Sequence, residues 1–234
     1  MPLLFEPPAP AAVPVVGSDA RFPVRRVYCV GRNYAAHARE MGRDPDKEPP
    51  FFFMKPADGV VTGIGPLSVH YPPGTSNYHH ELELVVALSG GGRNVPVDRA
   101  LELVFGYAIG LDMTRRDLQL AARDLGRPWD FGKAFDESAP LGPLHPVAAV
   151  GHPDKGTIQL EVNGKERQKA DLADLIWSVP ETISFLSDYY TLCPGDLIFT
   201  GTPAGVAAVV AGDRLVGRID GLGALDVTIL PPLG

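Results

Sequence analysis

The sequence has few cysteines, no long apolar run and no cluster of basic residues, and each absence excludes a class of protein. Its 234 residues contain two cysteines, Cys29 and Cys193, which predicts reduced thiols rather than a disulfide-stabilised secreted fold. No uninterrupted apolar stretch approaches the roughly 18 residues that a membrane helix requires, so we expect no membrane partner. The net charge of −7 and the lack of a Lys/Arg run argue against nucleic acid as a partner.

The first 23 residues are distinguished by proline. Six prolines within residues 1–23 favour an extended arm over a helix. We expect this arm to precede a single domain over residues 24–234, because a chain of this length can form one substantial core. The first residues also lack the positively charged start and continuous apolar stretch of a secretion signal, so we expect a cytoplasmic protein.

Short apolar segments separated by Gly and Pro dominate the rest of the sequence and indicate a β-rich fold. The principal expected strands are 27–30, 51–54, 79–88, 104–111, 197–200, 214–219 and 224–230. The pair Asn163-Gly164 predicts a tight hairpin between two further strands. Helices are expected over 34–41, 97–103, 114–125 and 180–190. Because strands and helices do not alternate regularly, we predict an α+β fold with a large curled sheet.

Segment 79–88 places two carboxylates on a strand that is otherwise apolar. Residues i and i+2 of a strand share a face, so Glu81 and Glu83 lie on one side while leucines and a valine occupy the other. Two carboxylates on a buried strand repel each other unless a cation lies between them. A third carboxylate, Asp112, follows directly after the apolar strand 104–111.

The set of Glu81, Glu83 and Asp112 predicts a site for Mg2+ or Mn2+, because these hard cations prefer oxygen ligands. His79 lies on the same strand face as the two glutamates and could complete a zinc-like set instead. The alternative without a metal is a solvated strand edge with alternating acidic residues.

His37 and Glu40 are three residues apart and therefore share one face of the expected helix 34–41. A histidine oriented by a carboxylate can act as the general base that activates water. The alternative is that both side chains belong to a solvated helix face.

A third group of polar residues could bind an anion. Arg116 and Gln119 are three apart on the helix that follows Asp112, and Lys133 lies farther along the chain. The turn 200–205 offers hydroxyls and backbone N–H groups that can bind a carboxylate. Each could be structural when taken alone. A divalent cation with three carboxylates leaves one negative charge, so an anionic substrate would require Lys133 and at least one arginine nearby.

In this order the motifs resemble the fumarylacetoacetate hydrolase family, specifically its compact single-domain bacterial members. The resemblance covers roughly residues 24–232 and is carried by segments 31–40, 80–83, 110–119, 133–136 and 200–205. It implies a mixed β-roll, a homodimer and a Mg2+ or Mn2+ ion. The metal ligands that it implies are Glu81, Glu83 and Asp112. The catalytic residues that it implies are His37 and Glu40 as the water-activating pair and Lys133 beside the reacting carbonyl. The implied substrate contacts are Arg32, Arg116, Gln119 and Thr202.

The resemblance also implies an activity, which is hydrolysis of the C–C bond of a 1,3-dioxo acid, a small anionic oxo-acid. Segments 51–56 and 127–129 are most similar to fumarylpyruvate hydrolases of gentisate breakdown, so the expected products are fumarate and pyruvate. Related members decarboxylate oxaloacetate or isomerise 2-hydroxyhepta-2,4-diene-1,7-dioate on nearly the same site, which leaves both reactions as alternatives. A non-catalytic, metal-stabilised β module is the alternative outside the enzymes.

Overall fold

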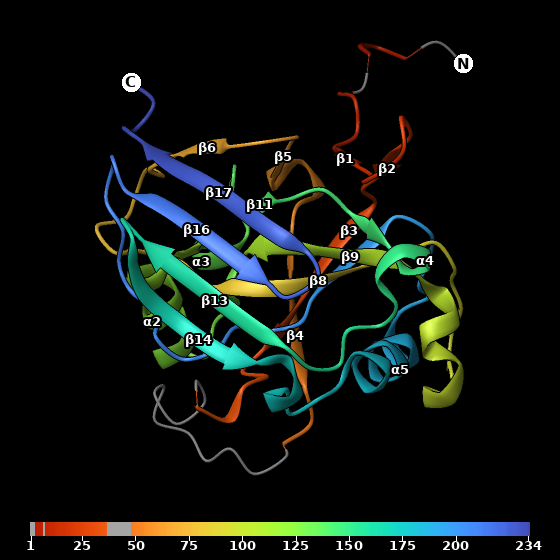
Figure 1. Cartoon of the computed structure of the whole chain (residues 1–234). Coiled ribbons are helices and arrows are strands. Elements are labelled where there is room, and N and C mark those ends of the chain that lie inside the picture. The colour runs from red at the N-terminus through yellow and green to blue at the C-terminus, as the bar shows by residue number, and fades with distance from the viewer. Residues whose placement is uncertain (1–2, 7, 37–47) are drawn as a thin grey trace.

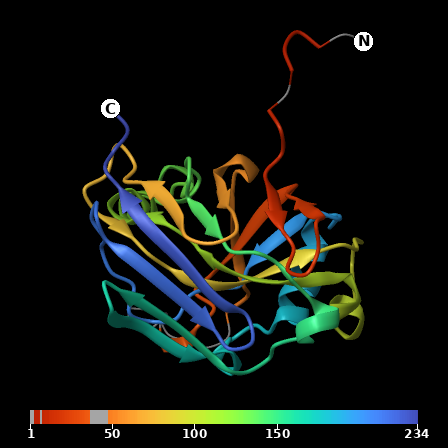
Figure 2. The same ribbon diagram turned by 45° about the horizontal axis from the view of Figure 1, so that its top comes forward.

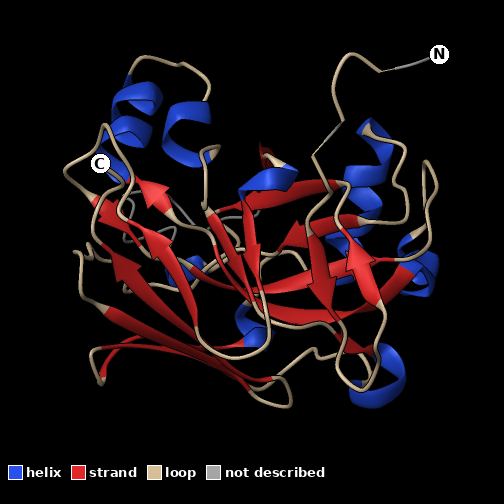
Figure 3. Cartoon of the chain, turned by 90° about the horizontal axis from the view of Figure 1, so that it is seen from above, coloured by secondary structure: helices blue, strands red, loops and turns tan. Residues whose placement is uncertain are grey.

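The computed structural model describes residues 3–6, 8–36 and 48–234, which form two strand layers with helices around them (Figure 1, Figure 3). The larger layer is an eight-stranded sheet that contains both parallel and antiparallel pairs. Its strands, in order across the sheet, are β4 (Phe51–Lys55), β3 (Arg26–Gly31), β15 (Asp196–Phe199), β8 (Leu82–Leu88), β9 (Val104–Leu111), β11 (Ala139–Leu141) and β5 (Val60–Thr62), with β12 (His145–Pro146) also paired to β9.

The second layer is a five-stranded sheet that lies in front of β8 and β9 in Figure 1. Its strands in order are β14 (Lys165–Asp171), β13 (Thr157–Val162), β16 (Arg214–Ile219), β17 (Gly223–Leu230) and β6 (Leu67–His70). The turn between β13 and β14 is the predicted Asn163-Gly164 hairpin, which is confirmed. Both turn residues have positive φ, 52° and 75°, as a two-residue turn that matches the strand twist requires.

The remaining elements lie around the two sheets (Figure 2, Figure 3). The α-helices with both ends in the described part of the chain are α2 (Arg116–Asp124), α3 (Asp130–Lys133), α4 (Val147–Val150) and α5 (Val179–Tyr189). The 3-10 helices are η1 (Ala57–Gly59), η2 (Val97–Leu103) and η3 (Leu172–Asp174). The two-stranded ribbons pair β1 (Ala12–Pro14) with β2 (Arg21–Pro23) and β7 (Tyr78–His79) with β10 (Thr114–Arg115). No helix among the described residues has both the length and the apolar character needed to cross a membrane.

Strand β8 is buried on both faces and joins two apolar clusters. Leu82, Leu84 and Val86 belong to the core between the two sheets, whereas Val85 and Ala87 belong to a second core on the opposite face. The arm contributes to this second core, because Val13 and Phe22 of the β1–β2 ribbon are buried in it. The division of the chain at residue 23 stays a prediction.

The predicted α+β architecture with a curled sheet is confirmed, and most expected strands are present within one or two residues. One expected strand is interrupted. Segment 79–88 ends a short strand at His79 and resumes at Leu82, so His80 and Glu81 lie between β7 and β8. Cys29 and Cys193 are both free thiols, the first buried and the second half-buried. The helix expected over 34–41 lies mostly outside the described residues.

Candidate metal and substrate site

The three predicted metal ligands converge where β8 begins and β9 ends. These strands are antiparallel neighbours with Glu83 opposite Gly110, and the Asp112 N–H donates to the Glu81 carbonyl oxygen at 2.8 Å. The register brings carboxylate oxygens of Glu81, Glu83 and Asp112 within 4.8 Å of one another. The exposed fractions of these residues are 4%, 1% and 1%, so the alternative of a solvated strand edge is wrong.

This buried carboxylate cluster fits a hard divalent cation. Burial, together with the nearby charges of Asp112 and Glu81, raises the pKa of Glu83 well above its ordinary value. A cation held among the three carboxylates would offset that repulsion, and an oxygen-only ligand set suits Mg2+ or Mn2+. Among the described residues the cluster consists of the three carboxylates, and His79 lies outside it, with its Nε2 2.8 Å from Asn77 Oδ1. The zinc-like set is therefore not formed.

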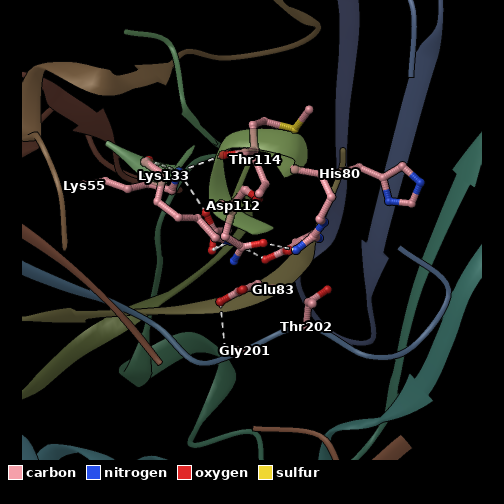
Figure 4. Close-up of polar contacts among 12 residues, drawn as sticks. Lys55, His80, Glu83, Asp112, Thr114, Lys133, Gly201 and Thr202 are labelled. Atoms are coloured by element: carbon pink, nitrogen blue, oxygen red, sulfur yellow. Dashed lines mark hydrogen bonds and ion pairs between the residues drawn. The ribbon is translucent and has the colours of Figure 1, made fainter. Parts of the chain in front are cut away.

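Lys133 comes from α3 and bridges two of the carboxylates (Figure 4). Its Nζ lies 2.6 Å from Glu81 Oε2 and 2.7 Å from Asp112 Oδ2. Burial opposes the charged form, but Asp112 and Glu81 raise the pKa of Lys133, so its ammonium stays protonated. The structure thus places Lys133 at the carboxylate cluster, whereas its expected role beside the reacting carbonyl of the substrate stays a prediction.

Lys55 is a second buried cation of the site, and the sequence reasoning missed it. Its Nζ lies 2.8 Å from Asp112 Oδ1 and donates to the carbonyl oxygens of Met113 and Lys133 at 2.9 and 2.6 Å. A signal was available, because Lys55 follows Phe51 and Phe53 with a period of two and so continues the inward face of β4. A lysine on such a face needs a buried partner.

Arg116 and Gln119 extend from the first turns of α2 toward the same cluster. The Arg116 guanidinium contacts both the Glu81 carboxylate and the Gln119 side-chain oxygen, and both residues are buried. The predicted spacing of three residues on one helix face is confirmed by this contact. The contact gives Glu81 a cationic partner besides Lys133.

The remaining predicted substrate contacts line the same cleft. Thr202 follows Gly201, whose N–H donates to Glu83 Oε2 at 2.7 Å, and Figure 4 shows Thr202 beside Glu83. Arg32 lies at the end of β3 with its guanidinium 5.1 Å from the centre of the Phe51 ring. Trp129 forms an aromatic wall of the cleft. The cleft is lined by Val30, Gly31, Arg32, Phe53, Glu81, Glu83, Arg116, Gln119, Trp129, Lys133 and Thr202.

His37 and Glu40 lie outside the described residues, so their role stays a prediction. The described residues on either side are both attached to Trp177. Asn33 donates to the carbonyl oxygens of Trp177 and Thr200 at 2.9 and 2.8 Å, and the Trp177 indole donates to the Glu48 carbonyl oxygen at 3.1 Å. Both flanks of segment 37–47 thereby bond to Trp177, and Asn33 also joins its flank to Thr200, at the start of the turn that carries Thr202.

Replacing Lys55 by methionine is expected to destabilise the metal-free protein by about 3–5 kcal/mol, because it leaves a carboxylate oxygen of Asp112 buried without its cation. Chemical denaturation without metal measures this loss. Lys169→Met is the matched control, since Lys169 forms an exposed ion pair with Glu166 and its loss is expected to change stability by less than about 1 kcal/mol. Equal effects of the two substitutions would contradict a structural role for the Lys55 pair.

Comparison with known proteins gives consistent matches over nearly the whole chain. Residues 26–230 match the family model described as the fumarylacetoacetate (FAA) hydrolase C-terminal domain. A crystal structure of fumarylpyruvate hydrolase from Pseudomonas aeruginosa in complex with Mn2+ and pyruvate is 58% identical, with a TM-score of 0.95 over 98% of this chain and 100% of that chain. A fumarylpyruvate hydrolase of Ralstonia sp is 51% identical over 193 residues, which is 82% of this chain and 99% of the relative. A mitochondrial oxaloacetate tautomerase of Oryza sativa subsp. japonica is 40% identical over 84% of this chain and 87% of its own length.

Proposed function

Because this chain belongs to the fumarylacetoacetate hydrolase family, we propose that it is a divalent-metal-dependent hydrolase that cleaves the C–C bond of an acylpyruvate. The substrate that we assign is fumarylpyruvate, which water converts to fumarate and pyruvate, a step of gentisate breakdown. Two relatives with that activity in their names, at 51% and 58% identity, support this substrate over others of the family.

The observation that carries the proposal is the balance of buried charge in the cleft. The three carboxylates are opposed by three cationic side chains, those of Lys55, Lys133 and Arg116. With all three carboxylates ionised, as metal ligation requires, these six side chains are neutral in sum, and a divalent metal ion adds two positive charges. A substrate with two carboxylate groups, such as fumarylpyruvate, restores neutrality in a site whose charged side chains are buried.

The chain's own residues divide the work of binding. Glu81, Glu83 and Asp112 would hold Mg2+ or Mn2+, which when bound supplies positive charge for the 2-oxo-carboxylate end of the substrate. Arg116 and Gln119, fixed against each other, orient that end of the substrate together with the hydroxyl of Thr202. Arg32 and Trp129 line the same cleft and are assigned to the rest of the substrate.

The reaction itself requires a base and a donor to the reacting carbonyl. His37, oriented by Glu40, takes a proton from water, and the water oxygen adds to the carbonyl carbon distal to the carboxylate. Among the described residues, Lys133 donates to Glu81 and Asp112, and its third N–H can donate to the oxygen that becomes negative. The C–C bond then breaks to give fumarate and the enolate of pyruvate, whose carbon accepts the proton that His37 took from water, while the new carboxyl group releases its proton to solvent.

A second candidate reaction acts on oxaloacetate. It is supported by relatives named oxaloacetate tautomerase, which match most of this chain at 38–41% identity. A site built for the 2-oxo-carboxylate group can accept oxaloacetate, because this acid carries the same group.

Product analysis distinguishes the two reactions. The protein with Mn2+ is incubated with fumarylpyruvate or with oxaloacetate in 18O-labelled water, and the products are identified by mass spectrometry. From fumarylpyruvate we expect pyruvate together with fumarate that carries one labelled carboxyl oxygen, and no reaction after EDTA treatment. Release of CO2 or tautomer exchange from oxaloacetate, without cleavage of fumarylpyruvate, would contradict the proposed hydrolase and support the second candidate.

We further propose that the enzyme is a cytoplasmic homodimer. The two free thiols support a reducing compartment. Light scattering on the purified protein measures the mass, and a value near 25.0 kDa instead of twice that mass would contradict the dimer.

A further inference from the structure

Gln168 is a buried amide on β14 whose orientation is determined by two backbone groups. The Leu82 N–H can only donate, and it lies 3.1 Å from Gln168 Oε1. The Pro203 carbonyl can only accept, and it lies 2.8 Å from Gln168 Nε2. The oxygen and nitrogen of the side chain are therefore assigned without ambiguity.

The orientation of Gln168 fixes the direction of its two other hydrogen bonds. His80 Nδ1 lies 3.0 Å from Gln168 Oε1, which has only lone pairs to offer, so Nδ1 carries a proton and donates. Gln168 Nε2 lies 2.8 Å from Thr202 Oγ1 and donates to it. Since the Thr202 oxygen accepts this bond, its own hydrogen is directed elsewhere. The hydroxyl lines the cleft beside the carboxylates, where it can donate to a ligand oxygen.

The backbone allows this contact only because residue 205 is glycine. Gly205 has a φ of +94°, and a Cβ atom there would lie 2.0 Å from the carbonyl oxygen of Arg167. The turn that carries Thr202 can thus approach β14 closely enough for Gln168 to reach the hydroxyl. His80 belongs to the segment before β8 and points away from Asp112 and Lys133 in Figure 4.

We propose that Gln168, supported by His80, is a positioning residue that makes the Thr202 hydroxyl a hydrogen-bond donor to the oxo-acid ligand. Gln168 does not line the cleft itself, and its effect passes through Thr202. That the ligand is an oxo-acid rests on the proposed function. It assigns a role to the histidine that precedes the metal-ligand motif and that is not itself in the carboxylate cluster.

The substitution that tests this proposal exchanges donor and acceptor in the hydrogen bond between residue 168 and Thr202. Gln168→Glu keeps the size of the side chain, but the introduced carboxylate accepts from the Thr202 hydroxyl and turns its hydrogen away from the ligand. We expect the Kd for pyruvate, measured by calorimetry on Mn2+-loaded protein, to rise about 10- to 100-fold, as for loss of a hydrogen bond to a charged group. The KM for fumarylpyruvate rises in parallel, whereas kcat changes little, because binding is lost equally in ground and transition states.

A double-mutant cycle separates positioning from a general charge or folding effect. Thr202→Val removes the hydroxyl and is expected to weaken pyruvate binding as much as Gln168→Glu does, whereas Thr202→Ser restores it. Adding Gln168→Glu to Thr202→Val should then cause no further loss. Gln159→Glu on β13 makes the same charge change outside the cleft and should leave binding unchanged.

The inference would be overturned if the two substitutions had additive effects, that is, if adding Gln168→Glu to Thr202→Val weakened pyruvate binding further. Failure of the unsubstituted protein to bind pyruvate would also overturn it. If Gln168→Glu does not fold, Thr202→Val and Thr202→Ser can still overturn the inference, because equal binding by those two variants contradicts a donor role for the hydroxyl. Absence of fumarylpyruvate hydrolysis with normal pyruvate binding would contradict the proposed function alone.

Discussion

Replacing Glu83 by glutamine is expected to abolish the stabilisation of the protein by Mn2+ and to eliminate hydrolysis, while raising the stability of the metal-free protein. The substitution removes a metal ligand. Mutating a residue that only hydrogen-bonds to a metal ligand lowers metal affinity about 10- to 100-fold, so losing the ligand itself should weaken metal binding by more than about 100-fold. The metal-free protein gains stability because a buried charge that repels Asp112 and Glu81 disappears. Glutamine can still accept the Gly201 N–H through its side-chain oxygen.

The stability that Glu83→Gln adds to the metal-free protein is expected to depend on pH. The pKa of Glu83 is raised in the folded protein, so the native state holds its proton more tightly than the unfolded chain does. The stability of the metal-free protein therefore falls as the pH rises above the ordinary carboxyl value of about 4.3 toward the raised one. The glutamine variant lacks this fall, so its advantage is expected to be larger at pH 8 than at pH 4.

Thermal unfolding with and without Mn2+, at both pH values, measures these effects. Glu102→Gln is the matched control, because Glu102 pairs with Arg99 on the surface and its replacement should leave the metal response unchanged. Glu83→Ala is expected to lose metal binding and turnover in the same way. A normal Mn2+ response in either Glu83 variant would contradict the assignment of this residue as a ligand.

Replacing His37 by alanine is expected to lower turnover of fumarylpyruvate about 10²- to 10⁴-fold while metal affinity stays unchanged. The reason is that a general base contributes about this factor to the rate, whereas the metal ligands come from other segments of the chain. Steady-state assays with Mn2+ give the turnover, and calorimetric titration with Mn2+ gives the affinity.

His152→Ala serves as the control for removal of an imidazole. His152 contacts Tyr107 through its Nδ1 at 2.7 Å and is not among the residues that line the cleft, so its loss should leave turnover close to that of the unsubstituted protein. Full activity of the His37 variant would contradict its assignment as the base. A parallel loss of Mn2+ affinity would indicate a structural role for this histidine instead.

The local pattern of the sequence was sufficient to predict the elements that depend on neighbours along the chain. The Asn163-Gly164 hairpin follows from the preference of these residues for positive φ, and the pairing of Arg116 with Gln119 follows from helical periodicity. The apolar segment around Glu81 and Glu83 predicted buried carboxylates, with a solvated strand edge as the alternative; the structure buries both, with Glu83 on β8 and Glu81 just before it. Asp112 was predicted from its place at a strand end. Each of these conclusions required only the chemistry and spacing of residues in one segment.

Other features depend on contacts between distant segments, which no spacing along the chain reveals. Lys55 and Asp112 are far apart in sequence, and three strands separate β4 from β9, so the two residues meet only because the sheet is curled. The hydrogen bonds of Gln168 join β14 of the second sheet to the turn after β15 of the first, and the direction of those bonds follows from backbone groups of Leu82 and Pro203.

The sequence by itself therefore determined the family resemblance, the three carboxylates, Lys133 and the kind of cation that they suit, because these depend on side-chain chemistry and local periodicity. Only the tertiary structure decided how the charges are balanced. It placed three buried cations against three buried carboxylates and left His79 outside the cluster. It also made the Thr202 hydroxyl oxygen the acceptor of a hydrogen bond from Gln168. Burial and hydrogen-bond direction are properties of packed neighbours, so they are established only when the two sheets come together.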